Sequence, residues 1–215
     1  METPAPWNLT GRAFILMYRF PEDFIRESCF IPEEWKILKW SGIGYVMLVD
    51  YKDSPVGPYN ELLIIPGKAD LAEKKLRTIS KIYVDSAESM FSGRSNWGIP
   101  KELTDFKWTQ KDRRHLIQVG GYLPWLEIRL EEGGFRFPFN TGLLPIHLYQ
   151  ELNGQKFRVS PKGKGTGRFS LVKDIKVDPY YFPELNLLEP LVAIYVNPFR
   201  ITFPVAEVES TGRYY

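Results

Sequence analysis

The stretch Gly42-Ile43-Gly44-Tyr45-Val46-Met47-Leu48-Val49-Asp50-Tyr51 decides the fold class of this chain. Its apolar side chains occur at successive positions rather than at alternate ones, which is typical of a strand that is buried on both faces or lines a barrel. After the turn-forming residues 53–59, a second apolar strand is predicted over residues 60–67. We therefore expect a fold built around buried β-strands.

Strand patterns also occur on both sides of this pair, whereas helix signals are few. Short helices are predicted at residues 21–28 and at 86–91, the second with Asp85 as N-cap and Gly93 as the terminating residue. Strand patterns occupy residues 11–20, 78–84, 106–110, 114–119, 125–130, 155–160 and 197–208. The prediction is a single domain over residues 1–215, mainly β (a β-dominated α+β fold), forming a closed or nearly closed β-barrel with short rim helices.

Two glycine-rich or proline-rich segments give no regular pattern. Residues 135–145 combine prolines with aromatic residues, which favours an ordered loop or plug. Residues 161–169 contain Gly-Lys-Gly-Thr-Gly, but a phosphate-binding loop requires a helix after the glycines, and here a strand pattern follows. A basic hairpin tip is predicted there instead.

Composition excludes several classes of protein. The 28 Lys and Arg residues against 26 Asp and Glu residues give a net charge of +2, so neither nucleic acid nor an anionic membrane is indicated as a partner. Cys29 is the only cysteine, and His115 and His147 lack metal-ligand spacing, so we expect neither an internal disulfide nor a metal. No apolar run approaches about 18 residues, and residues 1–6 show no leader pattern, so a cytoplasmic protein is expected.

Lys101 and Glu61 are the charged residues with the most unusual sequence surroundings. Lys101 follows Pro100 in a stretch, residues 92–103, that also holds two glycines, a tryptophan and an isoleucine. An amine in apolar surroundings can lose its proton and become a nucleophile, because desolvation penalises the ammonium form; the alternative is a solvated lysine at a loop exit. Glu61 opens an apolar strand, where it is either a strand-end carboxylate in water or a buried acid facing a pocket.

Four segments in this order resemble the acetoacetate decarboxylase family. They are Gly11-Arg12-Ala13-Phe14-Ile15-Leu16-Met17-Tyr18-Arg19, Gly57-Pro58-Tyr59-Asn60-Glu61, Gly93-Arg94 leading into Trp97-Gly98-Ile99-Pro100-Lys101, and Phe203-Pro204-Val205-Ala206-Glu207-Val208. The likeness extends from near Arg12 to near Val208. It implies a sheet-rich, cone-like fold or barrel that assembles into homo-oligomers.

The resemblance also implies a reaction. In that family the lysine after the proline forms a Schiff base with the ketone of a β-keto acid, so Lys101 would be the nucleophile, a small oxo acid the substrate, and no cofactor would be needed. Glu61 matches an acid near the lysine, and Arg12 matches a pocket arginine that could hold a carboxylate or orient the acid. A purely structural ion pair between Arg12 and Glu61 explains the same residues without chemistry.

The chain departs from the family pattern directly after the lysine. Acetoacetate decarboxylase itself has a second lysine at the position of Glu102. Because successive side chains of extended backbone point to opposite faces, we expect Glu102 to point away from Lys101. Aromatic and apolar neighbours that could line a substrate pocket are Tyr59, Phe91, Trp97, Ile99 and Phe106.

Three functions remain open from the sequence. The favoured one is a cofactor-free carboxy-lyase that acts on a β-keto acid through Lys101. The second is a Schiff-base aldolase-dehydratase acting on a pyruvate-like substrate. The third is a barrel that binds a small apolar ligand without reaction.

Overall fold

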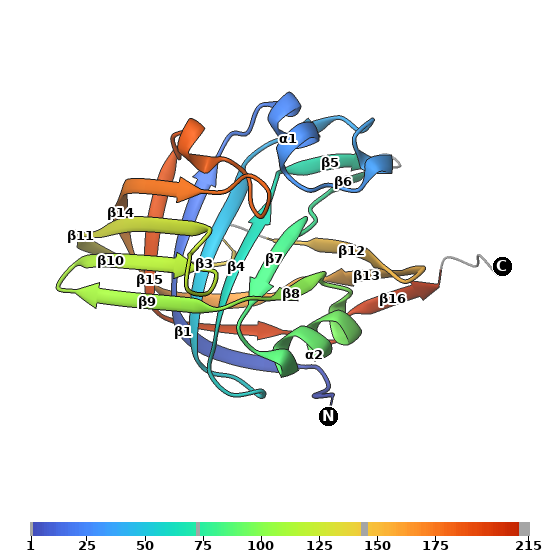
Figure 1. Ribbon diagram of the computed structural model, residues 1–215. Helices are drawn as coiled ribbons and strands as arrows, with labels where there is room; N and C mark the ends of the chain where they lie inside the picture. Colours follow the sequence, from blue (N-terminus) through green and yellow to red (C-terminus); the bar gives the residue numbers. More distant parts are fainter. Residues whose placement is uncertain (1, 72–73, 143–145, 211–215) are drawn as a thin grey trace.

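A ten-stranded sheet forms the body of the protein, whose computed structural model describes residues 2–71, 74–142 and 146–210 (Figure 1). The strand order is β8-β7-β4-β3-β1-β15-β14-β11-β10-β9, and only the β7–β8 pair is parallel among the described pairs of this sheet. The strands are β1 (Trp7–Tyr18), β3 (Gly44–Asp53), β4 (Tyr59–Ile65), β7 (Lys81–Val84), β8 (Lys101–Leu103), β9 (Phe106–Lys111), β10 (Arg114–Val119), β11 (Leu126–Asn140), β14 (Lys162–Val177) and β15 (Val192–Phe203).

Two small sheets and short helices complete the fold. One sheet consists of β2 (Trp40–Ser41), β5 (Lys68–Leu71) and β6 (Lys74–Leu76), and the other of β12 (Leu148–Leu152), β13 (Gln155–Val159) and β16 (Glu207–Ser210). The helices are α1 (Glu22–Ser28), α2 (Ala87–Trp97) and the 3₁₀ turns η1 (Glu33–Trp35) and η2 (Leu185–Leu187). The predicted β-dominated fold with short helices is therefore confirmed.

The large sheet is strongly curled. The ring of Phe14 on β1 stacks 5.9 Å from Trp108 on β9, although four strands lie between them in the sheet order. Phe14 also lies 4.9 Å from His115 on β10. In the part of the chain that the structure describes, the two ends of the sheet do not pair with each other, so the barrel-like prediction is confirmed in the form of an open half-barrel.

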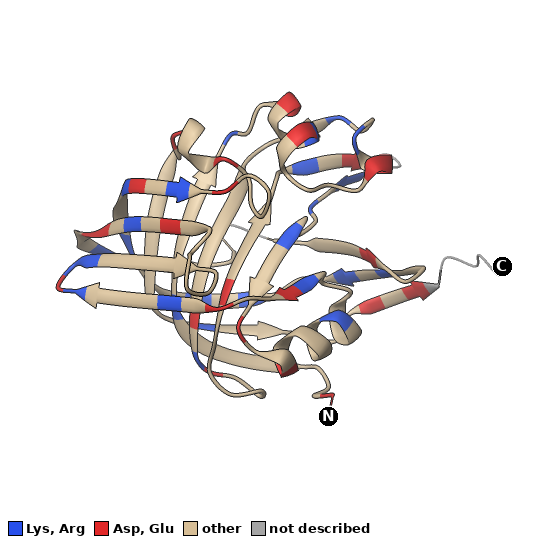
Figure 2. Cartoon of the chain, in the orientation of Figure 1, with Lys and Arg blue, Asp and Glu red and all other residues tan. Residues whose placement is uncertain are grey.

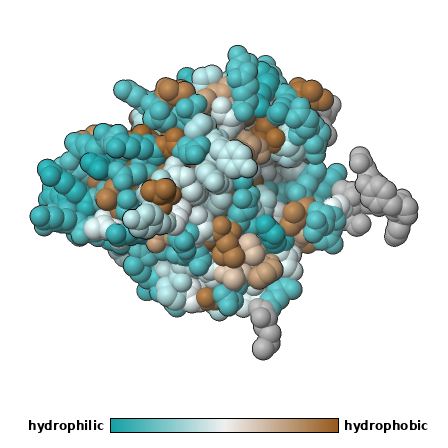
Figure 3. Space-filling view, viewed as in Figure 1, coloured by the Kyte–Doolittle hydropathy of each residue, from teal (hydrophilic) through white to brown (hydrophobic). Residues whose placement is uncertain are grey.

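Apolar side chains cover both faces of the central strands. Along β1, Leu9, Ala13 and Ile15 belong to one core, and Phe14 and Leu16 belong to the other, as the alternation of a strand requires. Figure 2 shows few charged residues on the central strands. The face in Figure 3 is mainly hydrophilic with scattered apolar residues. No helix in the described part of the chain is long and apolar enough to cross a bilayer.

Two segments that were predicted to be irregular are strands in the structure. Residues 135–140 continue β11, so the predicted loop or plug is wrong there, and residues 143–145 lie outside the described part. Residues 162–169 belong to β14 and are not a hairpin tip. The physical reason is close packing, because a Cβ at Gly165 would lie 2.6 Å from the carbonyl oxygen of Pro198 on the neighbouring strand.

Candidate active site

Lys101 is buried at the start of β8, and its amine contacts polar side chains. Its side chain is 4% exposed, and Nζ lies 2.9 Å from Oε2 of Glu61. The amine also donates a hydrogen bond to Oγ of Ser89 at 3.0 Å and lies 5.1 Å from the centre of the Tyr59 ring. The solvated loop-exit alternative does not describe this residue.

Helix α2 shapes the space that the lysine occupies. The side chain of Ser86 caps its first turn by accepting a hydrogen bond from the Ser89 backbone N–H, and Gly98 ends it in the left-handed conformation at φ +62°. Ser89 and Gly93 are four residues apart and therefore share one face. A Cβ at Gly93 would lie 2.8 Å from Cδ and Cε of Lys101, so the lysine packs directly on the helix backbone.

The same helix corrects part of the prediction. Ser86, not Asp85, is the N-cap, and Gly93 lies inside the helix rather than ending it. Asp85 instead accepts hydrogen bonds from the backbone N–H and side-chain amide of Asn60.

Glu61 lies on β4 opposite the lysine, in surroundings of phenol rings. Its side chain is 5% exposed, and Oε1 accepts a hydrogen bond from the Tyr51 hydroxyl at 3.3 Å. Burial, followed by the charge of Glu61, raises the pKa of both Tyr51 and Tyr59 well above the ordinary value. Both phenols therefore stay protonated near neutral pH and are available as hydrogen-bond donors at the site.

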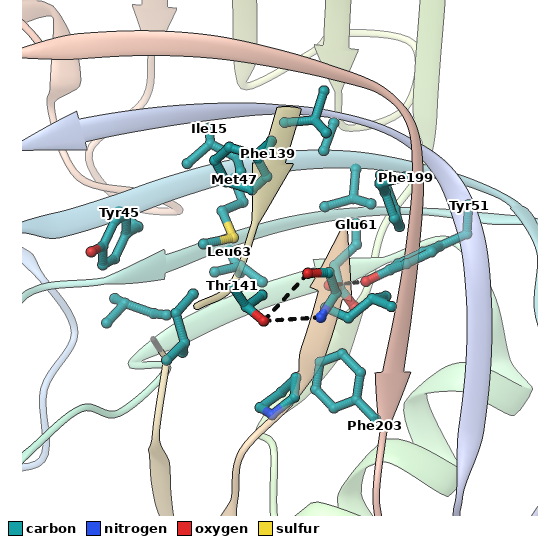
Figure 4. Close-up of a pocket in the computed structure, with 18 of the residues that line it drawn as sticks. Ile15, Tyr45, Met47, Tyr51, Glu61, Leu63, Phe139, Thr141, Phe199 and Phe203 are labelled. Carbon is teal, nitrogen blue, oxygen red and sulfur yellow. Dashed lines mark hydrogen bonds between the residues drawn. The ribbon is translucent and has the colours of Figure 1, made fainter. Parts of the chain in front are cut away.

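Two cavities meet at Glu61 and Tyr51. One of about 20 Å³ borders Lys101, and one of about 120 Å³ extends from Glu61 along the sheet. Figure 4 shows Glu61 and Tyr51 at one end of the larger cavity and Tyr45 toward the other, with Met47 and Leu63 between them. A ligand in the larger cavity would reach the lysine past the Glu61 carboxylate.

Glu102 points away from the site, as the alternation of extended backbone predicts. Its carboxylate lies 2.6 Å from Nζ of Lys81 on the adjacent strand β7. The negative charge of Glu102 is therefore paired outside the Lys101 pocket.

The structure does not bring Arg12 into this site. Arg12 lies on the opposite face of the sheet, where Nε is 2.8 Å from Oδ2 of Asp50 and the guanidinium lies 4.8 Å from the Trp108 ring. Its neighbour Ala13 lines the larger cavity instead. The alternative of a structural Arg12–Glu61 ion pair does not form either, because adjacent strand residues face opposite sides, and Ala13 rather than Arg12 faces the cavity that Glu61 borders.

The predicted pocket residues divide in the same way. Tyr59, Trp97 and Ile99 border the small cavity beside Lys101. Phe91 is 63% exposed on the outer side of α2, and Phe106 packs against the core on the other face of the sheet, so neither lines the pocket. Ser89, Gly93 and Tyr51 were not predicted as site residues.

No metal site accompanies this arrangement. Within residues 2–71, 74–142 and 146–210, no group of three or more His, Cys, Asp or Glu side chains could hold a metal ion. The polar groups at Lys101 are the Glu61 carboxylate, the Ser89 hydroxyl and the tyrosine phenols. Together they suit nucleophilic attack and proton transfer.

Comparison with known proteins shows which sequences and folds this chain resembles. Protein NEOXANTHIN-DEFICIENT 1 of Oryza sativa subsp. japonica is 28% identical over 129 residues, which are 58% of this chain and 42% of that protein. This chain thus spans less than half the length of that curated relative. The crystal structure of acetoacetate decarboxylase from Legionella pneumophila superposes with a TM-score of 0.74 at 14% identity, covering 96% of this chain and 88% of the other.

A second structure shares the fold. The enduracididine biosynthesis enzyme MppR, complexed with the condensation product of pyruvate and imidazole 4-carboxaldehyde, superposes with a TM-score of 0.64 at 15% identity, covering 98% of this chain and 92% of MppR. The family model described as acetoacetate decarboxylase matches residues 1–137, a range that includes Lys101, Glu61 and Ser89. The chain therefore belongs to the acetoacetate decarboxylase family.

Proposed function

We propose that the protein is a cofactor-free lyase that forms an imine between Lys101 and a β-keto acid and releases carbon dioxide. The observation that carries the proposal is the buried contact of 2.9 Å between Lys101 Nζ and Glu61 Oε2, beside a cavity. The carboxylate lies within reach of the ammonium group and is placed to accept a proton from it when the substrate carbonyl approaches. The free amine is then the nucleophile.

The reaction follows from the contacts of the amine. The Lys101 nitrogen attacks the keto carbon, one of its protons moves to the carbonyl oxygen, and protonation of the resulting hydroxyl lets water leave as the cationic imine forms. The bond to the carboxylate carbon then breaks, carbon dioxide departs, and the electron pair moves to the imine nitrogen to give an enamine. A proton adds to the enamine carbon, and water hydrolyses the imine to return Lys101.

Glu61 is the group placed to move these protons. It accepts one from Lys101 and returns it to the leaving hydroxyl, and it can later pass a proton taken up from solvent water to the enamine carbon. Ser89 holds the lysine in reach through its hydrogen bond of 3.0 Å. The small cavity of about 20 Å³ has room for a water, which requires about 10–15 Å³ and two to four polar partners, and Lys101, Glu61 and the tyrosines are such partners.

The charge distribution favours decarboxylation over aldol chemistry. Besides Lys101, the cations that border the two cavities are Lys164 and Arg200. Both are exposed, and both border the larger cavity but not the small one beside Lys101. A substrate carboxylate near Lys101 would thus be buried with no second cation, which is costly, and its departure as carbon dioxide removes that charge.

Aldol condensation and dehydration on a pyruvate-like substrate is the second candidate. The fold shared with the MppR complex supports it. A 2-oxo acid keeps its carboxylate through such a reaction, so the buried charge would remain. We therefore place it second.

Borohydride trapping separates these functions. The protein is incubated with acetoacetate, longer β-keto acids or pyruvate, reduced, and mapped by peptide mass, while carbon dioxide release is followed in parallel. We expect added mass on Lys101 and carbon dioxide from the β-keto acids, and neither with Lys101→Ala, whereas the matched control Lys81→Ala keeps both. Labelling by pyruvate without carbon dioxide release would favour the aldolase, and labelling of no residue would favour a binding protein.

A further inference from the structure

The larger cavity extends well beyond the group that the lysine would attack. On its floor, the cross-strand pairs Val49–Glu61, Met47–Leu63 and Tyr45–Ile65 follow one another along β3 and β4. Glu61 and Ile65 are four residues apart, so the cavity extends for about 13 Å along the strand. Among the described lining residues, the carboxylate of Glu61 and the Tyr51 phenol that donates to it lie at one end of this length.

The walls of that length are mostly apolar, and the two cations that border the cavity, Lys164 and Arg200, are exposed. Ile15, Met47, Leu63, Ile65 and Phe139 line it, and Figure 4 shows Met47, Leu63 and Phe139 beyond the Glu61 end. Thr141 also lines it, but its hydroxyl is already engaged, because it accepts a hydrogen bond from the Gly163 backbone N–H at 3.0 Å. A cavity lined in this way favours an apolar ligand over a hydrated one.

We propose that the substrate is a β-keto acid with an unbranched apolar tail, whose keto carbon lies at Lys101 and whose tail fills the cavity between Glu61 and Ile65. This inference rests on the proposed imine chemistry and assigns its substrate class. The cavity has a volume of about 120 Å³. A single water needs only about 10–15 Å³, so the cavity has room for a much larger group. Beyond Glu61, the positions of β3 and β4 that line the tail region are Tyr45, Met47, Val49, Leu63 and Ile65, and none of these side chains is charged.

A chain-length series tests the assignment. Acetoacetate and straight-chain homologues lengthened in steps of two methylenes are compared by kcat/KM for carbon dioxide release. Each buried methylene is expected to raise kcat/KM about fourfold until the cavity is filled. A kcat/KM that stays flat or falls with length, while acetoacetate still labels Lys101, would overturn the tail assignment and leave the imine chemistry standing.

Two methionines on the same face of the sheet provide a matched pair of variants. Met47 lines the cavity, whereas Met17 packs against the same core outside the lining. Met47→Trp should fill the middle of the cavity and abolish the gain, so that kcat/KM no longer rises from acetoacetate to its longer homologues. Met17→Trp should retain the gain, and loss of the gain in both variants, or in neither, would contradict the proposed tail position.

Binding without reaction gives an independent readout. Secondary alcohols of the same chain lengths cannot form an imine but present the same tail, and a ligand that binds the folded state raises Tm. We expect the rise in Tm to grow with chain length in the wild type and in Lys101→Ala, and to be lost in Met47→Trp. Failure of borohydride labelling with this length dependence intact would reject the chemistry alone, and absence of the dependence would reject the tail cavity.

Discussion

The side chain of Lys101 fills the space that a side chain at Gly93 would need: a Cβ on the glycine would lie 2.8 Å from Cδ and Cε of the lysine. The helix therefore contributes its bare backbone as one wall of the lysine channel. Lys101 reaches Glu61 and Ser89 because this wall has no side chain.

Gly93→Ala should accordingly disable the site without unfolding the protein. Alanine in a helix interior is favoured over glycine by about 0.5–1 kcal/mol, and the flexible lysine can move aside, so we expect little change in Tm. A displacement of the amine by about 1 Å from its reacting position can cost about a hundredfold in rate, and we expect borohydride labelling to slow by that order.

The control for this variant is Gly134→Ala. The atom nearest to a Cβ at Gly134 is an Arg113 guanidinium nitrogen at 3.8 Å, which is an ordinary contact. Labelling at the wild-type rate in Gly93→Ala would show that the lysine does not depend on the bare helix wall.

Glu61→Gln tests the proton-transfer role of the carboxylate. Turnover is expected to fall about a hundredfold or more, because an amide cannot take the proton of Lys101. Removal of one partner from a buried ion pair also costs about 3–5 kcal/mol of stability, so Tm should fall too. If Lys101 is replaced in addition, no unpaired charge remains, and Glu61→Gln with Lys101→Met should recover part of that Tm.

The decisive comparison is between activity and stability. Kinetics of carbon dioxide release and thermal unfolding are measured on the same preparations. Undiminished turnover in Glu61→Gln together with a lower Tm would mean that the residue is structural.

The fold class could be predicted because it depends on local patterns. The continuous apolar run of residues 42–51 indicated burial on both faces, and β3 contributes to both cores. The direction of Glu102 was also predictable, since adjacent residues of extended backbone diverge whatever the tertiary structure. Residues 135–140 were predicted as a loop because prolines and aromatics resemble loop composition, yet their partner strand β14 carries the glycines that permit close pairing.

The position of Arg12 could not be predicted in the same way. Alternation shows that Arg12 and Ala13 face opposite sides, but it does not show which side contains Glu61. That choice depends on pairing with β3, where Arg12 is opposite Asp50. Phe91 was misplaced for a comparable reason, because Ser89, Ser92 and Gly93 form the buried face of α2 and Phe91 does not share it.

Glu102→Gln should leave the pH profile of labelling unchanged. The carboxylate is paired with Lys81 at 2.6 Å on the far side of the strand, and its side chain is 44% exposed. An ion pair of that exposure contributes about 0–1 kcal/mol, so Tm should change little. The rate of borohydride labelling of Lys101 is measured across the pH range in both proteins, and a clear move of the profile toward lower pH in Glu102→Gln would show that this charge acts on the amine.

His115 should make the protein less stable in mild acid. Its side chain is 0% exposed, with Nε2 2.8 Å from Glu132 and Nδ1 accepting a hydrogen bond from Trp108 Nε1. Burial lowers the pKa of His115 below its ordinary value, although the neighbouring Glu132 acts in the opposite direction. Protonation would also remove the acceptor that Trp108 uses.

The direction of this change in stability follows from the pKa of His115 in the folded and unfolded states. Because the pKa is lower in the folded state, the unfolded chain binds the proton first as pH falls through about 6.5, and stability is lost below that value and retained above it. Chemical denaturation at a series of pH values between 5 and 8 measures this dependence. We expect His115→Gln to flatten it and the exposed control His147→Gln to retain it, whereas an equal dependence in all three proteins would assign the acid sensitivity to other groups.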